Sequence, residues 1–420
     1  MSPSPAPGTP EPDALETESA GSVGGSELAA PVPGLESAVP VPGLESAVPV
    51  PGPESAGPVP GLVSADPVPG PEQAGPVPEP ALTDFLLAHE LVAPGEAARW
   101  TPLAGGVSSD LWRVDLPGRS LCVKRALAKL RVAVDWQAPV SRNAYEWAWM
   151  RFATRHRPDS VPALLAHDPE AGLFAMAYLP PERYAVWKTQ LLRGEVDTTT
   201  AASVGEVLGA LHAASAGDPA LAEEFATDEN FHALRIEPYL LATAAAHPGL
   251  RDVLVALADR TAGTHLALVH GDVSPKNILV GPSHPVLLDA ECAWYGDPAF
   301  DLAFCLNHLI LKSLVVPGRR AELLESAQVL AAEYFRHADW EPRAGLEARV
   351  ASLLLARVDG KSPVEYLTDE RHRLIVRTTA SALLRAFAPT VEDVLDAWRT
   401  ALEGHTSARG DRHAQGRHRP

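Results

Sequence analysis

The chain has 420 residues, three cysteines and a formal net charge of −18. An acidic chain argues against a nucleic-acid partner, because phosphate backbones require basic surfaces, and it suits a cationic or neutral substrate. The cysteines lack CxxC spacing, and no apolar run approaches the roughly 20 residues of a membrane helix. We therefore expect a cytoplasmic protein with reduced cysteines, no structural metal, no secretory signal and no membrane partner.

Residues 1–80 are rich in Pro, Gly, Ser and Glu, and they contain no Lys or Arg. From Pro31 a nine-residue unit that begins as PVPGLESAV recurs at intervals of nine residues up to Pro67. The unit has too few large apolar side chains to offset the entropy of ordering, so we expect a disordered arm. A polyproline-type docking segment for a protein partner is the alternative, but Gly interrupts every unit.

Beyond residue 80 the pattern becomes that of a folded protein. Thr83 is expected to cap a short helix. Short strands are expected between Arg99 and Tyr178, and helical spacing of apolar residues dominates after Thr198. Strands first and helices later predict an α+β protein whose two lobes are segregated along the chain.

The expected boundaries are an N-lobe at residues 81–180 and a C-lobe at residues 181–408. Near the end, Thr390 has the pattern of an N-cap, with an acid three residues on. Residues 409–420 are polar and are expected to form a disordered tail.

The most informative stretch is HGDVSPKN at residues 270–277, which follows a short apolar strand. A hairpin is predicted at residues 278–288. Asp272 and Asn277 lie in the loop, and Asp289 directly follows the second hairpin strand. Three polar groups therefore gather at the mouths of short buried strands.

Phosphoryl transfer requires such a set of groups. The reaction needs hard oxygen ligands for Mg²⁺ and a carboxylate that orients the attacking hydroxyl and accepts its proton. Asp272 would be that carboxylate, and Asn277 and Asp289 would hold the metal that bridges the nucleotide phosphates. His270 is expected to be structural, with its ring bonded to the loop backbone.

The pattern HGDxxxxN, followed by LLDAE at residues 287–291 and WYGDPAFDL at residues 294–302, resembles the aminoglycoside phosphotransferase and choline kinase family. Around residues 124–146 the chain is similar to 5-methylthioribose-kinase-like members. The resemblance covers roughly residues 95–400. It implies a two-lobed protein-kinase-like fold and Mg²⁺-dependent transfer of phosphate from ATP or GTP to a small-molecule hydroxyl.

The part of the loop that follows Asp272 departs from the family's commoner pattern. Where that pattern has His-Pro-Gly or similar after the aspartate, this chain has Val273-Ser-Pro-Lys276. Lys276 either neutralises charge on the transferring phosphoryl group, as a catalytic residue beside Asp272, or is a loop lysine that faces solvent.

The resemblance also implies where the nucleotide binds. A glycine-containing loop between two strands would cover the phosphates, and a strand lysine paired with a helix glutamate would contact them. The glutamate could instead be an ordinary exposed helix acid. A strand and hinge would receive the adenine ring. The residues implied are Gly105, Gly106, Ser108, Ser109, Lys124, Glu146, Met176, Ala177, Tyr178 and Leu179.

The acceptor would bind over the loop, against C-lobe helices, and residues 231–238 are expected to line the same cleft. Asp301 could instead anchor the loop, and Arg357 with Asp359 could form a solvated helix end. Glu291 could support the metal or contact substrate. The candidate substrate contacts are Glu291, Asp297, Asp301, Asn307, Arg357 and Asp359.

The acceptor class stays open between a sugar, an amino alcohol and an aminoglycoside-like compound. A catalytically silent kinase fold that only binds a ligand is the alternative function. The presence of Lys124, Asp272, Asn277 and Asp289 together argues against it, because a silent module is expected to have lost at least one of them.

Overall fold

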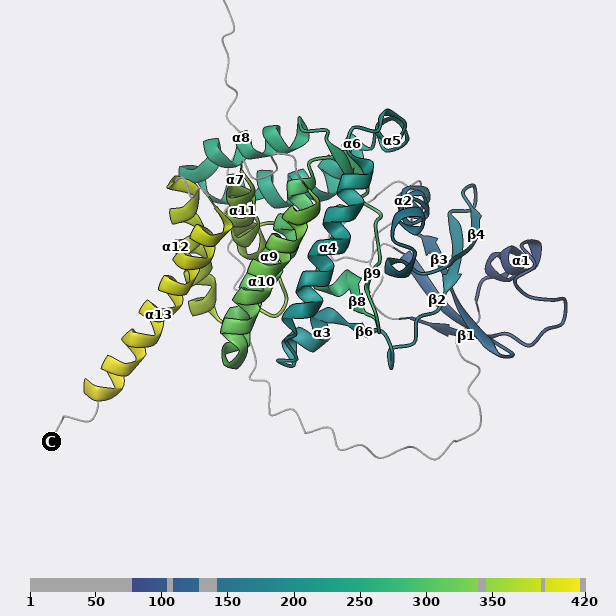
Figure 1. The fold of residues 1–420 in the computed structure, drawn as a ribbon, viewed down its shortest axis with the longest axis horizontal. Helices are drawn as coiled ribbons and strands as arrows, with labels where there is room; N and C mark the ends of the chain where they lie inside the picture. The colour runs from purple at the N-terminus through teal and green to yellow at the C-terminus, as the bar shows by residue number, and fades with distance from the viewer. Residues whose placement is uncertain (1–77, 104–108, 128–141, 339–344, 387–389, 416–420) are drawn as a thin grey trace, which may run out of the picture. The chain divides into compact units, whose positions relative to one another are not determined.

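The chain folds into a β-rich N-lobe and a larger helical C-lobe, in the order of a protein-kinase-like fold (Figure 1). The expected Pro-rich arm and glycine loop fall largely outside the residues that this computed structural model describes. The described residues are 78–103, 109–127, 142–338, 345–386 and 390–415.

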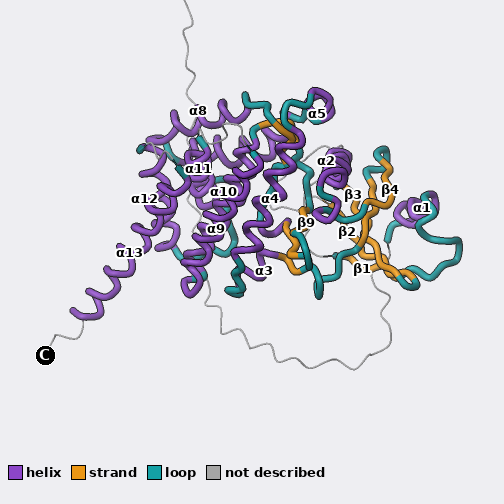
Figure 2. Tube along the Cα trace, viewed as in Figure 1, coloured by secondary structure: helices purple, strands orange, loops and turns teal. Residues whose placement is uncertain are grey.

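The N-lobe contains a five-stranded antiparallel sheet, with the spatial order β1-β2-β3-β5-β4 (Figure 2). This confirms the strands expected between Arg99 and Tyr178. The strands are β1 (Arg99–Pro102), β2 (Ser109–Leu116), β3 (Arg119–Ala126), β4 (Leu164–Asp168) and β5 (Leu173–Ala177).

The alternation of side chains along β3 decides which of them faces the rest of the molecule. Leu121 and Val123 pack with helix α1 (Pro80–Ala88) in a small core of their own. Cys122 points to the opposite face, where helix α2 (Arg142–His156) covers the sheet and joins the main core. Lys124 shares that face, so its ammonium group is directed toward the C-lobe.

Helix α1 begins earlier than expected. Pro80 occupies its first turn and Glu79 is the N-cap residue, so Thr83 lies inside the helix and does not cap it. Proline favours the first turn because its φ is already helical and its missing N–H would have no partner there. This start signal was available in the sequence and outweighs a threonine three residues later.

The C-lobe contains two small sheets beside the N-lobe. Strand β7 (Ala267–Val269) pairs with β10 (Trp294–Gly296). Strand β8 (Ile278–Val280) pairs with β9 (Pro285–Leu287) and with β6 (Ala185–Val186). The predicted hairpin at residues 278–288 is therefore confirmed, and it fixes both ends of the loop that holds Asp272.

Helices form the rest of the C-lobe, around the central helix α9 (Pro298–Val315). This helix is apolar enough to cross a membrane, but 94% of it is buried inside the lobe, as in the core helix of a folded domain. The other helices are α3 (Trp187–Leu192), α4 (Thr198–Ser215), α5 (Pro219–Glu224), α6 (Asp228–Phe231), α7 (Ala242–Ala246), α8 (Arg251–Ala262), α10 (Arg320–His337), α11 (Leu346–Asp359), α12 (Glu370–Arg385) and α13 (Val391–Gln415), with a π-helical segment at His232–Leu241 and short 3-10 turns at Pro158–Ser160, Pro248–Leu250, Pro275–Asn277 and Pro317–Arg319.

The expected cap of the last helix is present. Thr390 Oγ1 accepts a hydrogen bond from the backbone N–H of Asp393 (3.2 Å). The helix buries Val394 and Trp398 against the lobe. It continues to Gln415 and so reaches into the 409–420 segment for which we expected disorder.

Candidate active site

The loop at residues 270–277, here called the HGD loop, is held in place by Asp301 on helix α9. The two carboxylate oxygens of Asp301 accept hydrogen bonds from the backbone N–H groups of His270 (2.7 Å) and Gly271 (2.8 Å). The Asp301 side chain is completely buried. Asp301 therefore anchors the loop, which corrects its place among the candidate substrate contacts, because both of its carboxylate oxygens are already bonded to the loop backbone.

Gly271 is required for the shape of the HGD loop. Its φ is +80°, and a Cβ atom built there would lie 2.5 Å from the carbonyl oxygen of Cys292. Glycine alone avoids both the left-handed strain and the overlap.

His270 joins the loop to the hairpin. Its Nε2 lies 3.1 Å from the carbonyl oxygen of Leu288, and its Nδ1 accepts from the backbone N–H of Asp272 (3.1 Å). These bonds require the neutral tautomer with hydrogen on Nε2. Burial lowers the pKa of His270, which favours that neutral form. The ring thus makes the backbone contacts that we expected of a structural histidine.

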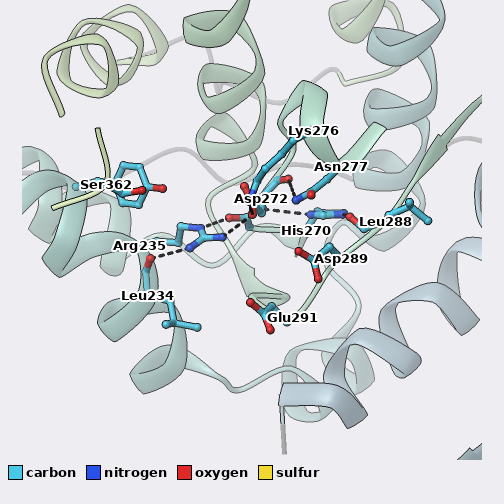
Figure 3. A network of polar contacts seen from close by, with 12 residues as sticks. Leu234, Arg235, His270, Asp272, Lys276, Asn277, Leu288, Asp289, Glu291 and Ser362 are labelled. Carbon is cyan, nitrogen blue, oxygen red and sulfur yellow. Dashed lines mark hydrogen bonds and ion pairs between the residues drawn. The ribbon is translucent and has the colours of Figure 1, made fainter. Parts of the chain in front are cut away.

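Asp272 lies at the centre of the site, between two cations (Figure 3). Its Oδ2 is 3.1 Å from Lys276 Nζ and 3.1 Å from Arg235 Nη2. Burial raises the pKa of the Asp272 carboxyl, but the charges of Lys276 and Arg235 outweigh burial and hold the pKa well below its usual range. Asp272 is therefore an ionised, oriented carboxylate at neutral pH.

Lys124 connects the two lobes. Its Nζ lies 2.8 Å from Glu146 Oε1 on helix α2 and 2.5 Å from Asp289 Oδ1 at the end of the hairpin. Burial lowers the pKa of Lys124, but Asp289 and Glu146 outweigh burial and raise the pKa above its usual range. Glu146 is itself buried, so it is not the exposed helix acid of the alternative interpretation.

Asn277 and Asp289 present oxygen atoms on either side of Asp272. Asn277 Nδ2 donates to the backbone carbonyl of Asp272 (3.1 Å), which leaves its side-chain oxygen for another partner. Asp289 has a φ of +69°, uncommon for a residue other than glycine, and its side chain is 29% exposed. The strained backbone aims a partly accessible carboxylate out of the hairpin.

These two residues fit a magnesium ion that is also bound by phosphates. Mg²⁺ usually takes one or two protein oxygens together with water and substrate phosphates, and one amide with one carboxylate is such a set. Within the described ranges no group of three or more His, Cys, Asp or Glu side chains could hold a metal. The donor set therefore suits a nucleotide-bound Mg²⁺ better than a permanent metal centre.

Of the expected nucleotide residues in the glycine loop, Gly105, Gly106 and Ser108 lie outside the described residues. Ser109 is described, and it begins β2 with a buried side chain.

The expected adenine-contacting segment, residues 176–179, follows β5 at the join between the lobes. Met176 is inside the strand, paired with Cys122. The backbone N–H groups of Ala177 and Tyr178 donate to Ala163 (2.8 Å) and Ser120 (3.4 Å). Since these two N–H groups are already bonded, contacts to the base would have to come from the carbonyl groups of this segment or from Leu179.

A family comparison agrees with this geometry. The family model described as "Phosphotransferase enzyme family" matches residues 99–346, which include the sheet, Lys124, the HGD loop and Asp289. The chain belongs to this family.

Curated relatives of this phosphotransferase include methylthioribose kinases. A methylthioribose kinase of Pectobacterium atrosepticum is 26% identical over 227 residues, which are 47% of this chain and 55% of that protein. A methylthioribose kinase of Escherichia coli is 26% identical over 242 residues, covering 49% and 57%. The chain thus spans little more than half the length of these relatives.

Solved structures of similar fold include a choline/ethanolamine kinase family protein and a choline kinase. A choline/ethanolamine kinase family protein from Mesorhizobium loti is 18% identical, with a TM-score of 0.43 over 76% of this chain and 98% of that one. A choline kinase from Streptococcus pneumoniae is 15% identical, with a TM-score of 0.38 over 78% and 99%. Both likenesses are too distant to indicate a substrate.

Two more of the candidate acceptor contacts of this phosphotransferase have structural partners inside the C-lobe. Asp297 caps helix α9 through the N–H of Ala299 (3.1 Å) and forms a buried ion pair with Arg349. Asn307 is fully buried and donates to carbonyl groups of its own helix. The Asp297 contacts correct the expectation that Asp297 binds substrate. The side-chain oxygen of Asn307 is buried without a hydrogen-bond partner, so the contact expected of Asn307 stays a prediction.

Asp359 is also committed to packing. Its carboxylate bridges His247 Nε2 (2.8 Å) and Arg377 Nη2 (2.7 Å), and it ties α11 to α12. This corrects its place among the acceptor contacts. The alternative of a solvated helix end does not fit Arg357, which is 8% exposed and points inward.

Glu291 and Arg357 remain near the site. Glu291 Oε2 lies 3.0 Å from Arg142 Nε, and its charge acts on Lys124 in the same direction as that of Asp289. Its expected contact with metal or substrate stays a prediction. Arg357 Nη1 donates to Tyr239 Oη (3.1 Å) and to the hydroxyl of Ser362 (3.0 Å).

Arg235 was missed by sequence reasoning. We expected only that residues 231–238 line the cleft. The structure shows that Arg235 Nε donates to the carbonyl of Gly271 while Nη2 pairs with Asp272. Its position on the π-helical segment, with Pro238 inside that segment, is a recurrent feature of functional sites. The available signal was an arginine directly between the apolar residues Leu234 and Ile236.

Proposed function

We propose that this protein is a Mg²⁺-dependent kinase that moves the γ-phosphate of ATP or GTP to a hydroxyl group of a small molecule. The observation that carries the proposal is the buried Asp272 carboxylate, 3.1 Å from each of two cations, in the loop that also presents Asn277. Membership of the phosphotransferase family over residues 99–346 supports it.

The residues at the junction of the lobes would bind the nucleotide. Lys124, held by Glu146, would contact the phosphates, and Ser109 would lie at the edge of the covering loop. Asn277 and Asp289 would hold Mg²⁺, which when bound neutralises charge on the β- and γ-phosphates. The residues at 176–179 would contact the base.

The chemical step requires little more than positioning. The acceptor oxygen attacks the γ-phosphorus, the bond from that phosphorus to the β–γ bridging oxygen breaks, and the nucleoside diphosphate leaves. The hydroxyl proton passes to Asp272. Lys276, which already faces Asp272, would stabilise the negative charge on the phosphoryl oxygens.

Three further points belong to the same proposal. Methylthioribose kinases among the relatives favour a sugar or simple alcohol over an aminoglycoside as acceptor. The three cysteines are free and buried, which fits a reducing cytoplasm. We place the lobe boundary near residue 180, since β5 ends at Ala177 and β6 begins at Ala185.

The proposal is tested by Mg²⁺-dependent ADP release with a panel of sugar, amino-alcohol and aminoglycoside acceptors, beside Asp272→Asn. An acceptor-stimulated rate that falls by about 100-fold or more in the variant is expected, because a general base contributes that much. Equal rates for both proteins would contradict the role of Asp272.

A catalytically silent binding module fits the site less well than a kinase does. A fold that only binds ligand has no need to keep a buried carboxylate ionised, yet Arg235 and Lys276 do so here. Nucleotide binding without turnover for any acceptor would favour this alternative.

A further inference from the structure

The charge beside Asp272 is opposite to that of the chain as a whole. Arg235 and Lys276 contact Asp272 directly. Three more cations lie beyond them, on three different helices. Together these five residues, here called the cationic face, are Lys188 on α3, Arg235 on the π-helical segment, Lys276 in the HGD loop, Lys312 on α9 and Arg357 on α11.

Lys312 is the most unusual member. It is 1% exposed, its Nζ donates to the carbonyl of His308 over a long 3.4 Å, and it lies 4.7 Å from the ring centroid of Tyr366. Within the described residues no carboxylate forms an ion pair with it. A buried ammonium without a carboxylate is costly, and an anion bound beside it would offset that cost.

Arg357 has the same feature. It is 8% exposed, and its Nη1 bonds to Tyr239 and Ser362, which are neutral. Its Nε is buried without a hydrogen-bond partner, and no carboxylate pairs with it among the described residues. Nearby, His308 Nε2 is likewise buried and unpartnered. The site therefore holds an unsatisfied donor, Arg357 Nε, as well as uncompensated positive charge.

These groups are close to the reacting carboxylate. Tyr239 accepts from Arg357, and its ring lies 5.8 Å from the Arg235 guanidinium. Helix α3, which carries Lys188, packs against both the Pro275–Asn277 turn and α9. Figure 3 shows Ser362, which Arg357 holds, on the side of Asp272 away from Asp289. The cationic face thus continues from Asp272 away from the metal side, where an acceptor would lie.

We propose that the phosphate acceptor carries an acidic group, either a carboxylate or a phosphate ester, and that Arg357 and Lys312 bind this group while the acceptor hydroxyl lies at Asp272. The inference rests on the proposed kinase function and names its substrate class. It excludes choline-like and aminoglycoside-like acceptors, because a cation would meet uncompensated positive charge.

The titration of Lys312 supports this assignment. Burial, and then the charge of Lys188, lowers the pKa of Lys312 to about 7. An anion bound beside it would restore the charged form, so binding would take up a proton above about pH 7. The groups that face Lys312 are Lys188, Cys305, His308, Arg357, Glu365 and Tyr366. Lys188 pairs with Glu365, and burial holds His308 neutral by lowering its pKa and the Cys305 thiol neutral by raising its pKa.

The test measures binding without turnover, by thermal shift in the presence of saturating AMP-PNP and Mg²⁺. The probes form two sets, each built on one carbon skeleton. The first set is glucose, glucuronate, glucose 6-phosphate and glucosamine. The second, smaller set is glycerol, glycerate, glycerol 3-phosphate and 3-amino-1,2-propanediol. Glucuronate and glycerate report a carboxylate, and the two phosphate esters report a phosphate.

We expect an acidic member of a set to bind at least about tenfold more tightly than its neutral parent, the worth of one added charge-assisted hydrogen bond. Arg357→Met and Lys312→Met should each remove this preference. Lys361→Met is the matched control, since Lys361 is exposed, pairs with Glu237, and should leave the preference intact. Arg357 also bonds to Ser362, so Arg357→Met could lose the preference through a change in that turn. Lys312→Met tests the preference without that complication.

Neutral or amine members that bind as well as the acids would overturn the inference, and so would an acid preference that persists in both variants. The outcome is separate from that of the proposed function. ADP release driven by a neutral alcohol would keep the kinase and reject the acidic acceptor. Selective binding of acids without ADP release from any of them would keep the acidic ligand and reject the kinase.

Discussion

At the scale of single residues, the site depends on how Asp272 is kept ionised although it is buried. Two cations share one of its oxygens, and one of them, Arg235, also binds the backbone of Gly271. Arg235 is therefore a positioning residue, which fixes both the charge and the direction of the carboxylate.

Replacing Arg235 by Met should lower kcat and move the acid limb of the kcat profile to higher pH. The sign follows from the two opposing effects on Asp272, because burial raises its pKa and the arginine lowers it. A pH–rate profile of Arg235→Met measures this. Lys361→Met, which removes a cation paired with the same π-helical segment, should leave the limb in place. A lower kcat with an unmoved acid limb would mean that Arg235 acts only through the fold.

Lys312 gives a prediction about stability. Its pKa is about 7 in the folded protein and near 10.5 when unfolded, so the folded state loses stability as pH falls from about 10.5 to 7 and the loss is complete below that. Lys312→Met should therefore raise the free energy of unfolding at pH 7 by about 1–4 kcal/mol, and by less as pH rises. Urea unfolding at two pH values checks this. A destabilised variant, or a difference that does not change with pH, would contradict it.

At the scale of elements, the HGD loop is specified by its attachments. Strand β7, the hairpin and Asp301 fix its ends, and Gly271 permits its bend. Gly271→Ala should be destabilised more than Gly118→Ala and should also lose activity. Gly118 has the same left-handed φ (+78°) but nothing within 4 Å of a Cβ, so it isolates the backbone strain of about 1–2 kcal/mol. Equal melting temperatures for the two variants would show that the contact with Cys292 is unimportant.

The sequence was most informative where chemistry and local structure coincide. The HGD loop, the hairpin and Asp289 are adjacent in the chain, and turn residues mark their limits, so they could be placed without the fold. The pairing of Lys124 with Glu146 was expected from the family resemblance, and the structure places the two groups 2.8 Å apart.

Long-range placement could not be predicted in this way. Arg235 reaches Asp272 only because the π-helical segment packs against the loop, and no local pattern reports that contact. Asp297 and Asp359 have the same residue type as a substrate contact, but their ion pairs with Arg349 and Arg377 depend on how α9, α11 and α12 pack. The total charge of the chain is acidic, but a sum over the chain does not report the local charge around Asp272, where Arg235 and Lys276 lie.

At the scale of the whole molecule, the described site lies entirely within residues 78–415. Every described side chain of the site lies after Glu79 in the chain, and Glu79 itself pairs with Arg125. We therefore expect deletion of residues 1–77 to leave kcat and KM unchanged within about twofold, as for surface changes away from a site. Steady-state kinetics of the truncated protein check this, with the full chain as control. A large loss of activity would assign the Pro-rich arm a part in catalysis.

The two lobes are joined across the proposed nucleotide site by Lys124, which pairs with Glu146 in one lobe and Asp289 in the other. Lys124→Met should therefore raise KM for nucleotide and lower kcat together. Arg357→Met and Lys312→Met, in contrast, should change the binding of the acceptor. Initial rates with both substrates varied separate these effects. A change in acceptor KM alone would contradict the assignment of Lys124 to the nucleotide.

The central claim is that Asp272 serves a transfer of phosphate to an alcohol. The most direct measurement is ³¹P NMR of ATP, Mg²⁺ and an acceptor mixture that includes sugar acids, with the wild-type protein and Asp272→Asn. We predict that the γ-phosphate signal is replaced by that of a phosphate ester with the wild-type protein and persists with the variant. Release of inorganic phosphate alone, at the same rate in both proteins, would contradict the account.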